Sequence, residues 1–235
     1  MTLRTRPSAR YQRVGDGEHS EVFRRPGSRW CIQLFTVDCP ELTIRKVRDE
    51  YHYLRQVYAA LPQLLPAQRL FACHPAAHIS ETVLVKEWVD VDTTRPLNHT
   101  RASDLPAACV DDLHQFIGVT RELLDRAASE PMLLPDIIDT RFQNLAVDTG
   151  GRLRLLDTNR LINTVALRAL PPGQILDPDR RPIHARLLRR LMYLQAAFAG
   201  ATRRDLADDP LYRRYLSPAV LHRLFDESTA HGEPI

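Results

Sequence analysis

The stretch "DTRFQNLAVDTGGRLRLLDTN", residues 139–159, predicts two short strands joined by a tight turn. Apolar residues follow Asn144, the Asp-Thr-Gly-Gly run at 148–151 is typical of a turn, and residues 152–156 begin with alternating arginine and leucine. Asp139 precedes Asn144 by five positions, and Asp157 follows Asn144 by thirteen. Because strand pairing brings the two ends of a hairpin together, we expect these two acids and this amide to lie close in space.

These three side chains suit a magnesium site beside a reactive hydroxyl. Magnesium prefers hard oxygen ligands and usually takes one or two carboxylates, with water and phosphate oxygens in its other positions. Asn144 and Asp157 can approach one ion from neighbouring strands, while Asp139 can orient a hydroxyl and accept its proton. This set favours transfer of a nucleotide's terminal phosphoryl group. In the alternative interpretation, Asp139 caps a turn and Asn144 is a buried hydrogen-bonding residue.

The rest of the chain predicts an α+β protein with two lobes. The N-terminal part alternates in the manner of strands, in "RYQRVG", "SEVFRR", "RWCIQLFTV", "QRLFAC" and "ETVLVKEWV", with an amphipathic helix over residues 41–60. A polar, proline-bearing segment at 92–106 separates it from a mostly helical part, with helices over about 106–128 and 183–200 and two short ones at the end. We expect one domain over 1–235, with an N-terminal lobe at about 10–90, a C-terminal lobe at about 91–235, and ligand between them.

At this point the sequence resembles the protein-kinase-like superfamily. The spacing of Asp139, Asn144 and Asp157 matches that family's catalytic loop and metal-binding aspartate. "VGDGEHSEVF", residues 14–23, resembles its glycine-rich loop, which implies that Gly15, Gly17 and Ser20 cover the phosphates. In the alternative interpretation, the two glycines serve a hairpin turn that needs positive φ.

Three further motifs follow in the family's order. "WCIQLF" resembles the strand that carries a phosphate-binding lysine, with Gln33 in the lysine's place, and "DEYHYLRQV" resembles the helix that carries its glutamate partner, Glu50. "VLVKEWV" resembles the hinge strand that reads adenine through backbone groups around Glu87 to Val89, with Lys86 close by. The resemblance covers residues 11–160, and the small size is similar to the YrbL-like group of bacterial kinase-like proteins.

The resemblance implies a cytoplasmic bacterial phosphotransferase that uses ATP and Mg²⁺ and acts on a hydroxyl of a protein or small molecule. Three departures stand against it: Ile137-Ile138 replace His-Arg, Thr158-Asn159 replace Phe-Gly, and Gln33 replaces the lysine. They leave two alternatives open. One is a pseudokinase that acts as a nucleotide-binding or regulatory interaction module, and the other is a kinase-fold AMP transferase.

The lysine count sharpens the question of the missing charge. Of the 32 basic residues two are lysines, Lys46 and Lys86, and the others are arginines. Gln33 is neutral, so it cannot pair with Glu50 or neutralise a phosphate. Lys46, one helical turn before Glu50, or Lys86 in the hinge strand can supply the charge instead. In the alternative interpretation, Glu50 and Lys46 form a solvated pair and Lys86 points away from the site.

Composition predicts which partners are absent. A net charge of +3 does not favour nucleic acid, and no apolar run is long enough to span a membrane. Four scattered cysteines predict reduced thiols. The basic helix over 183–200 carries an apolar set that we expect to pack in the C-terminal lobe, with its arginines facing solvent: Leu187, Leu188, Leu191, Met192 and Leu194.

Overall fold

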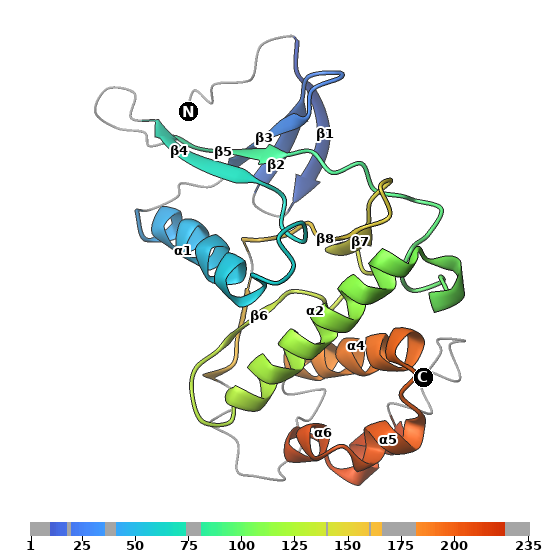
Figure 1. The fold of residues 1–235 in the computed structure, drawn as a ribbon. Coiled ribbons are helices and arrows are strands. Elements are labelled where there is room, and N and C mark those ends of the chain that lie inside the picture. The colour runs from blue at the N-terminus through green and yellow to red at the C-terminus, as the bar shows by residue number, and fades with distance from the viewer. Residues whose placement is uncertain are drawn as a thin grey trace.

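The structure is a computed structural model that describes residues 10–17, 20–35, 41–73, 81–139, 141–159, 161–165 and 182–223. Its N-terminal half is a five-stranded antiparallel sheet with one helix beside it (Figure 1). The strands lie in the order β1, β2, β3, β5, β4, and all neighbours are antiparallel. Their bounds confirm the predicted strands: β1 Gln12–Gly17, β2 Ser20–Arg24, β3 Trp30–Phe35, β4 Gln68–Cys73 and β5 Glu81–Glu87.

Helix α1, Glu41–Val57, confirms the amphipathic helix expected between the third and fourth strands. Val47, Tyr51 and Leu54 recur at steps of three and four residues, and all three are buried on one face. After the helix, Tyr58 stacks on Phe116 of the helical half, with ring centroids 5.3 Å apart. This contact joins the sheet half to the helical half.

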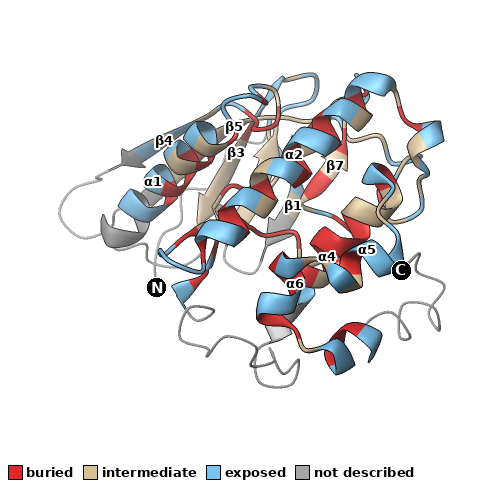
Figure 2. Cartoon of the chain, turned by 60° about the horizontal axis from the view of Figure 1, so that its bottom comes forward, coloured by how far each residue is buried: buried red, intermediate tan, exposed pale blue. Residues whose placement is uncertain are grey.

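The C-terminal half is mostly helical. Its elements are η1 Ala102–Asp104, α2 Ala107–Arg126, α4 Pro182–Ala199, α5 Arg203–Asp208 and α6 Pro210–Tyr215. Figure 2 shows buried residues in stripes along these helices, with exposed residues on their other faces. The apolar set predicted on α4 is buried, as expected. The prediction for its arginines is wrong at Arg190, which is 4% exposed and has its guanidinium carbon 6.0 Å from the centroid of the Phe142 ring.

The predicted hairpin is present as β7 Leu145–Val147 and β8 Leu153–Leu155, paired antiparallel. Gly151 closes its turn with φ of +74°, a conformation that favours glycine. A second small sheet was not predicted: β6 Leu133–Pro135 pairs with β9 Leu161–Asn163.

The hairpin is fixed to the helical half by Asp112 of α2. Its Oδ1 and Oδ2 accept hydrogen bonds from the Arg152 guanidinium at 2.9 and 2.8 Å, and Oδ2 also accepts from the Leu153 N–H at 3.2 Å. Gln63, on the loop after α1, donates to Oδ1 at 2.7 Å. One buried carboxylate therefore connects the α1 loop, α2 and β8.

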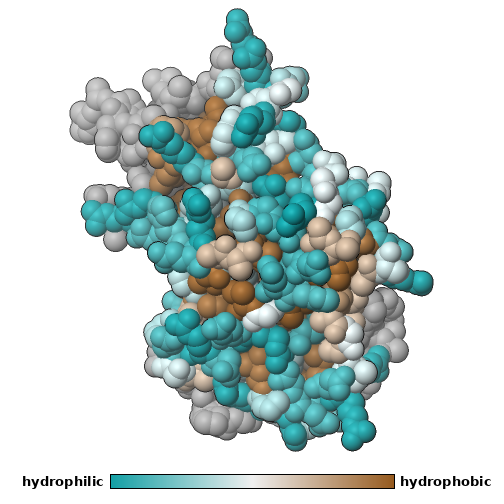
Figure 3. Space-filling view, viewed as in Figure 1, coloured by the Kyte–Doolittle hydropathy of each residue, from teal (hydrophilic) through white to brown (hydrophobic). Residues whose placement is uncertain are grey.

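The predicted α+β fold class is confirmed: a small antiparallel sheet and one helix are followed by a mostly helical half. Among the described residues, no helix combines the length and hydrophobicity that crossing a bilayer requires. Hydrophilic residues cover much of the face in Figure 3, with hydrophobic residues visible between them.

Candidate functional site

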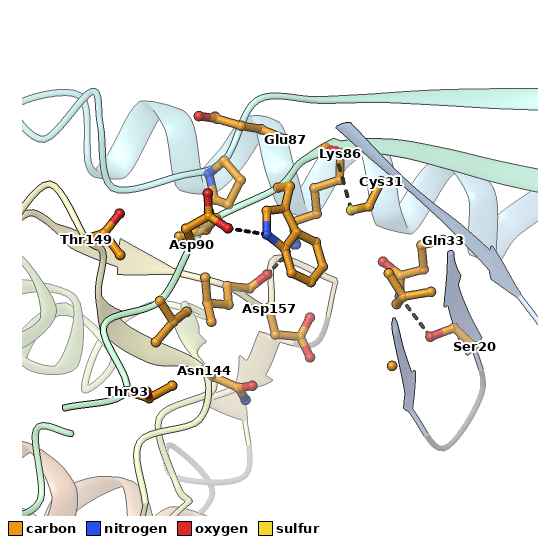
Figure 4. A pocket seen from close by; sticks show the side chains of 17 residues that line it. Ser20, Cys31, Gln33, Lys86, Glu87, Asp90, Thr93, Asn144, Thr149 and Asp157 are labelled. Carbon is orange, nitrogen blue, oxygen red and sulfur yellow. Dashed lines mark hydrogen bonds between the residues drawn. The ribbon is translucent and has the colours of Figure 1, made fainter. Parts of the chain in front are cut away.

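A cavity of about 930 Å³ lies where the sheet, the segment after β5 and the hairpin meet (Figure 4). Eight of the residues predicted from the sequence line it: Gly15, Ser20, Gln33, Lys86, Glu87, Val89, Asn144 and Asp157. Three others, Gly17, Glu50 and Asp139, are not among its lining residues. Segments more than a hundred residues apart in the sequence thus contribute to one cavity, of the size that a small-molecule ligand occupies.

The roof of the cavity is formed by β1, β2 and β3. The Gln33 Nε2 donates to the Ser20 Oγ at 2.8 Å, which holds the Gln33 amide against β2. Gly15 is not among the described residues with positive φ, and a Cβ built on it would meet Val22 Cβ at an ordinary 3.9 Å. Backbone strain therefore does not explain this glycine. Gly17 pairs with Ser20 at the end of the hairpin, whose tip at residues 18–19 lies outside the described residues.

The segment after β5 contributes Trp88, which lies inside the predicted hinge range of Glu87 to Val89, but for whose side chain the sequence predicted no role. Its indole Nε1 donates to Asp90 Oδ1 at 2.6 Å, and the Arg24 guanidinium carbon lies 4.4 Å from the ring centroid. Its backbone N–H donates to the Arg29 carbonyl at 2.9 Å. Within the part of the chain that the structure describes, the N–H and C=O of Val89 have no hydrogen-bond partner, which leaves both for a ligand.

The same segment is attached to the hairpin. The Thr149 N–H donates to the Asp90 carbonyl at 2.9 Å. The guanidinium of Arg154, whose side chain is 12% exposed, lies 3.2 Å from both Glu87 Oε2 and Asp148 Oδ2. The Glu87 carboxylate is therefore paired with Arg154, and residues 87–90 are bonded to the hairpin.

Asn144 and Asp157 lie together at the hairpin end of the cavity. The Asn144 Nδ2 donates to the Asp136 carbonyl at 3.2 Å, so its Oδ1 is the end that is left for a ligand. The Asp157 Oδ1 accepts from the Asn159 N–H at 2.9 Å, which holds the carboxylate in place. One carboxylate and one amide oxygen fit magnesium, which takes few protein ligands. The described residues contain no group of three or more His, Cys, Asp or Glu side chains placed to hold a metal.

Asp139 adopts a turn-capping arrangement. Its Oδ1 and Oδ2 accept from the Arg141 and Gln143 N–H groups, each at 3.1 Å, and its carbonyl accepts from the Phe142 N–H at 3.2 Å. Phe142 has φ of +51°, an unusual value for an aromatic residue, and these bonds stabilise that turn. The arrangement matches the capping alternative, and the predicted role of Asp139 toward a hydroxyl stays a prediction.

Glu50 is 4% exposed, so the interpretation of a solvated residue is wrong. Its Oε1 lies 3.6 Å from the Nζ of Lys46, whose side chain is 64% exposed. Its Oε2 is buried and has no hydrogen-bond partner among the described residues. Burial raises the pKa of Glu50, and the Lys46 ammonium opposes this shift.

Lys86 points into the cavity from β5. Its Nζ donates to the Leu156 carbonyl, immediately before Asp157. Burial lowers the pKa of Lys86, and the nearby Asp157 carboxylate opposes this shift. Cys31, which lies opposite Lys86 on β3, is a buried free thiol whose pKa is raised by burial. The interpretation in which Lys86 points away from the site is wrong.

Comparisons with known proteins add little. No family model matches the chain, and no curated protein matches it. Among solved structures it is similar to a microcompartment-associated aminopropanol kinase, with 11% identity over 92% of each chain and a TM-score of 0.40. At that similarity, the function has to be argued from the residues of the site.

Proposed function

We propose that the protein is an ATP- and magnesium-dependent phosphotransferase that acts on a hydroxyl of a protein or small molecule. One observation carries the proposal: a single cavity combines a glycine-bearing roof, the Val89 backbone groups that have no partner in the described part of the chain, and the oxygen pair of Asn144 and Asp157. In this proposal the cavity lies between an N-terminal and a C-terminal lobe that meet near residue 91.

The adenine of the nucleotide binds beside Trp88 and Val89, through the free N–H and C=O of Val89. Its phosphates lie under Gly15 and Ser20, where the absence of a side chain at Gly15 leaves room for them. Asn144 and Asp157 would hold magnesium, which neutralises phosphate charge when bound. Asp139 orients the acceptor hydroxyl and takes up its proton, because a carboxylate keeps acceptor capacity after two N–H bonds.

A second candidate is a pseudokinase that binds nucleotide without turnover. The observation that favours it is the separation of Gln33 from Glu50: Gln33 is bonded to Ser20, and Glu50 is paired with Lys46. The lysine–glutamate pair of the family that the sequence resembles therefore has no counterpart at these two positions.

The test measures ATP binding by calorimetry with and without magnesium, in the parent and in Asp157→Asn. We expect magnesium to strengthen binding in the parent, and Asp157→Asn to weaken magnesium-dependent binding by about tenfold or more, since few carboxylates hold the ion. Asp104→Asn, at an exposed position in η1, is the matched control. Equal affinity in parent and Asp157→Asn would refute the metal role.

Products then distinguish the candidates. Mass spectrometry after incubation with ATP and mixed hydroxyl acceptors identifies an added phosphate or an added AMP. Magnesium-dependent binding without any product favours the pseudokinase, and an added AMP identifies the transferase alternative.

A further inference from the structure

The charges that face the cavity are unusual for a site that holds a nucleotide. Among the described residues that line it, three are carboxylates, Glu87, Asp90 and Asp157, and Lys86 is the one cation. Glu87 and Asp90 each have an arginine partner, at 3.2 and 3.8 Å. A polyphosphate needs compensating positive charge in a partly enclosed site, and on these walls Lys86 provides it.

The strand register places Lys86 beside the position that lacks a charge. Cys31 pairs with Lys86 and Gln33 pairs with Leu84 in the antiparallel β3–β5 ladder, so Gln33 and Lys86 lie on one face as diagonal neighbours. Such neighbours are roughly 7–8 Å apart, within reach of a long side chain. The Lys86 ammonium reaches the carbonyl of Leu156 and so lies next to Asp157, the proposed magnesium ligand. It therefore lies at the phosphate end of the cavity.

The ammonium of Lys86 is near the Asp157 carboxylate but forms no direct ion pair among the described residues. Within the described part of the chain, it forms no ion pair, and its hydrogen bond goes to a neutral carbonyl. A partly buried charge in this situation is unfavourable unless a further partner binds it. Lys46 contrasts with it at both points, since its side chain is 64% exposed and it already pairs with Glu50.

We infer that Lys86 binds a phosphate oxygen of the nucleotide and supplies, from the hinge strand, the positive charge that Gln33 does not. This inference rests on the proposed nucleotide site and adds to it the residue that distinguishes a phosphorylated ligand from a bare nucleoside. It also assigns Gln33 a structural role, as the hydrogen-bond donor that holds Ser20.

The test compares the affinities for adenosine and for ADP, measured by calorimetry in the full chain. We expect Lys86→Met to lose about tenfold or more in ADP affinity, the value of a charge-assisted hydrogen bond, and to keep its adenosine affinity. Lys46→Met is the control, and its ratio of ADP to adenosine affinity should equal that of the parent. Loss of an unpaired, partly buried charge should leave Lys86→Met folded, which its melting temperature checks.

A charge-transfer variant gives an independent readout. Gln33→Lys in the Lys86→Met background places a lysine on the diagonal neighbour, and it should restore most of the lost ADP affinity. Unchanged ADP affinity in Lys86→Met, or an equal loss of adenosine and ADP affinity, would overturn the inference while leaving the nucleotide site intact. If the parent binds neither ligand, the proposed function fails, and the inference fails with it.

Discussion

Asp112 gives the most direct test of how the hairpin is held. Its side chain is 5% exposed, and it accepts four hydrogen bonds from two segments: two from Arg152 and one from the Leu153 N–H in the hairpin, and one from Gln63 on the loop after α1. We expect Asp112→Ala to remove the attachment of β8 to α2 and to leave the buried Leu153 N–H without this acceptor.

The magnitude follows from the burial of each partner. Breaking a fully buried ion pair costs about 3–5 kcal/mol. Arg152 is 43% exposed, so water can solvate part of the released guanidinium, and the value falls at the lower end of this range. We therefore expect Asp112→Ala to lower the free energy of unfolding by about 3 kcal/mol.

Equilibrium urea unfolding, followed by circular dichroism, measures the change. Asp111→Ala is the matched control, because Asp111 lies in the same turn of α2 with its side chain exposed, and it should change the free energy of unfolding by less than about 0.5 kcal/mol. A loss below about 1 kcal/mol for Asp112→Ala, no larger than that of an average substitution, would refute the reasoning that this carboxylate anchors the hairpin.

Three further predictions concern the turn, the buried acid and the proposed base. Gly151→Ala should lower the free energy of unfolding in urea by about 2 kcal/mol, because φ is +74° and the new Cβ would lie 2.8 Å from Pro106 Cγ. Gly118→Ala is the control in α2, where the new Cβ meets open space, and it should raise the free energy of unfolding by roughly 0.5–1 kcal/mol. Glu50→Gln should raise the Tm by about 2 °C at pH 8. Burial raises the pKa of Glu50 in the folded parent. At a pH between the ordinary and the raised pKa, the folded protein therefore binds more protons than the unfolded chain, and the parent loses stability as the pH rises through this window. The gain in Tm should therefore shrink at pH 5. Equal gains at both pH values would contradict a raised pKa at Glu50. Asp139→Asn should keep ATP affinity but lower turnover by about a hundredfold, and equal turnover would identify a turn residue.

Local patterns predicted the larger elements of this fold because their burial is periodic. The buried positions of α1 recur every three or four residues, and the hairpin joins an apolar run to a turn and an alternating run. The strands β6 and β9 carry no such signal, since each is three residues long and one ends in proline. They form because residues 133–135 and 161–163 are brought together by the rest of the fold, which no local pattern records.

The candidate site divides in the same way. The spacing of Asn144 and Asp157 follows from one hairpin, so the sequence could predict that they approach each other. Trp88 could not be identified, because its position depends on Arg24 from β2 and on Asp90 after β5. Arg190 is a comparable case. Arginine side chains are usually solvated, so the sequence did not predict that this one would be buried near the Phe142 ring.

The attachment of the hinge segment to the hairpin determines how changes at the site can be interpreted. Arg154 bridges Glu87 and Asp148, and the Thr149 N–H bonds to the Asp90 carbonyl, so both ends of the proposed nucleotide site belong to one hydrogen-bonded unit. None of these bonds involves the Lys86 ammonium or the Asp157 carboxylate. A substitution at Asp157 should therefore change ligand affinity without displacing the hinge. A substitution at Lys86 removes its bond to the Leu156 carbonyl but leaves the Arg154 and Thr149 bonds that hold the hinge. Loss of Arg154 should disturb adenine and metal binding together.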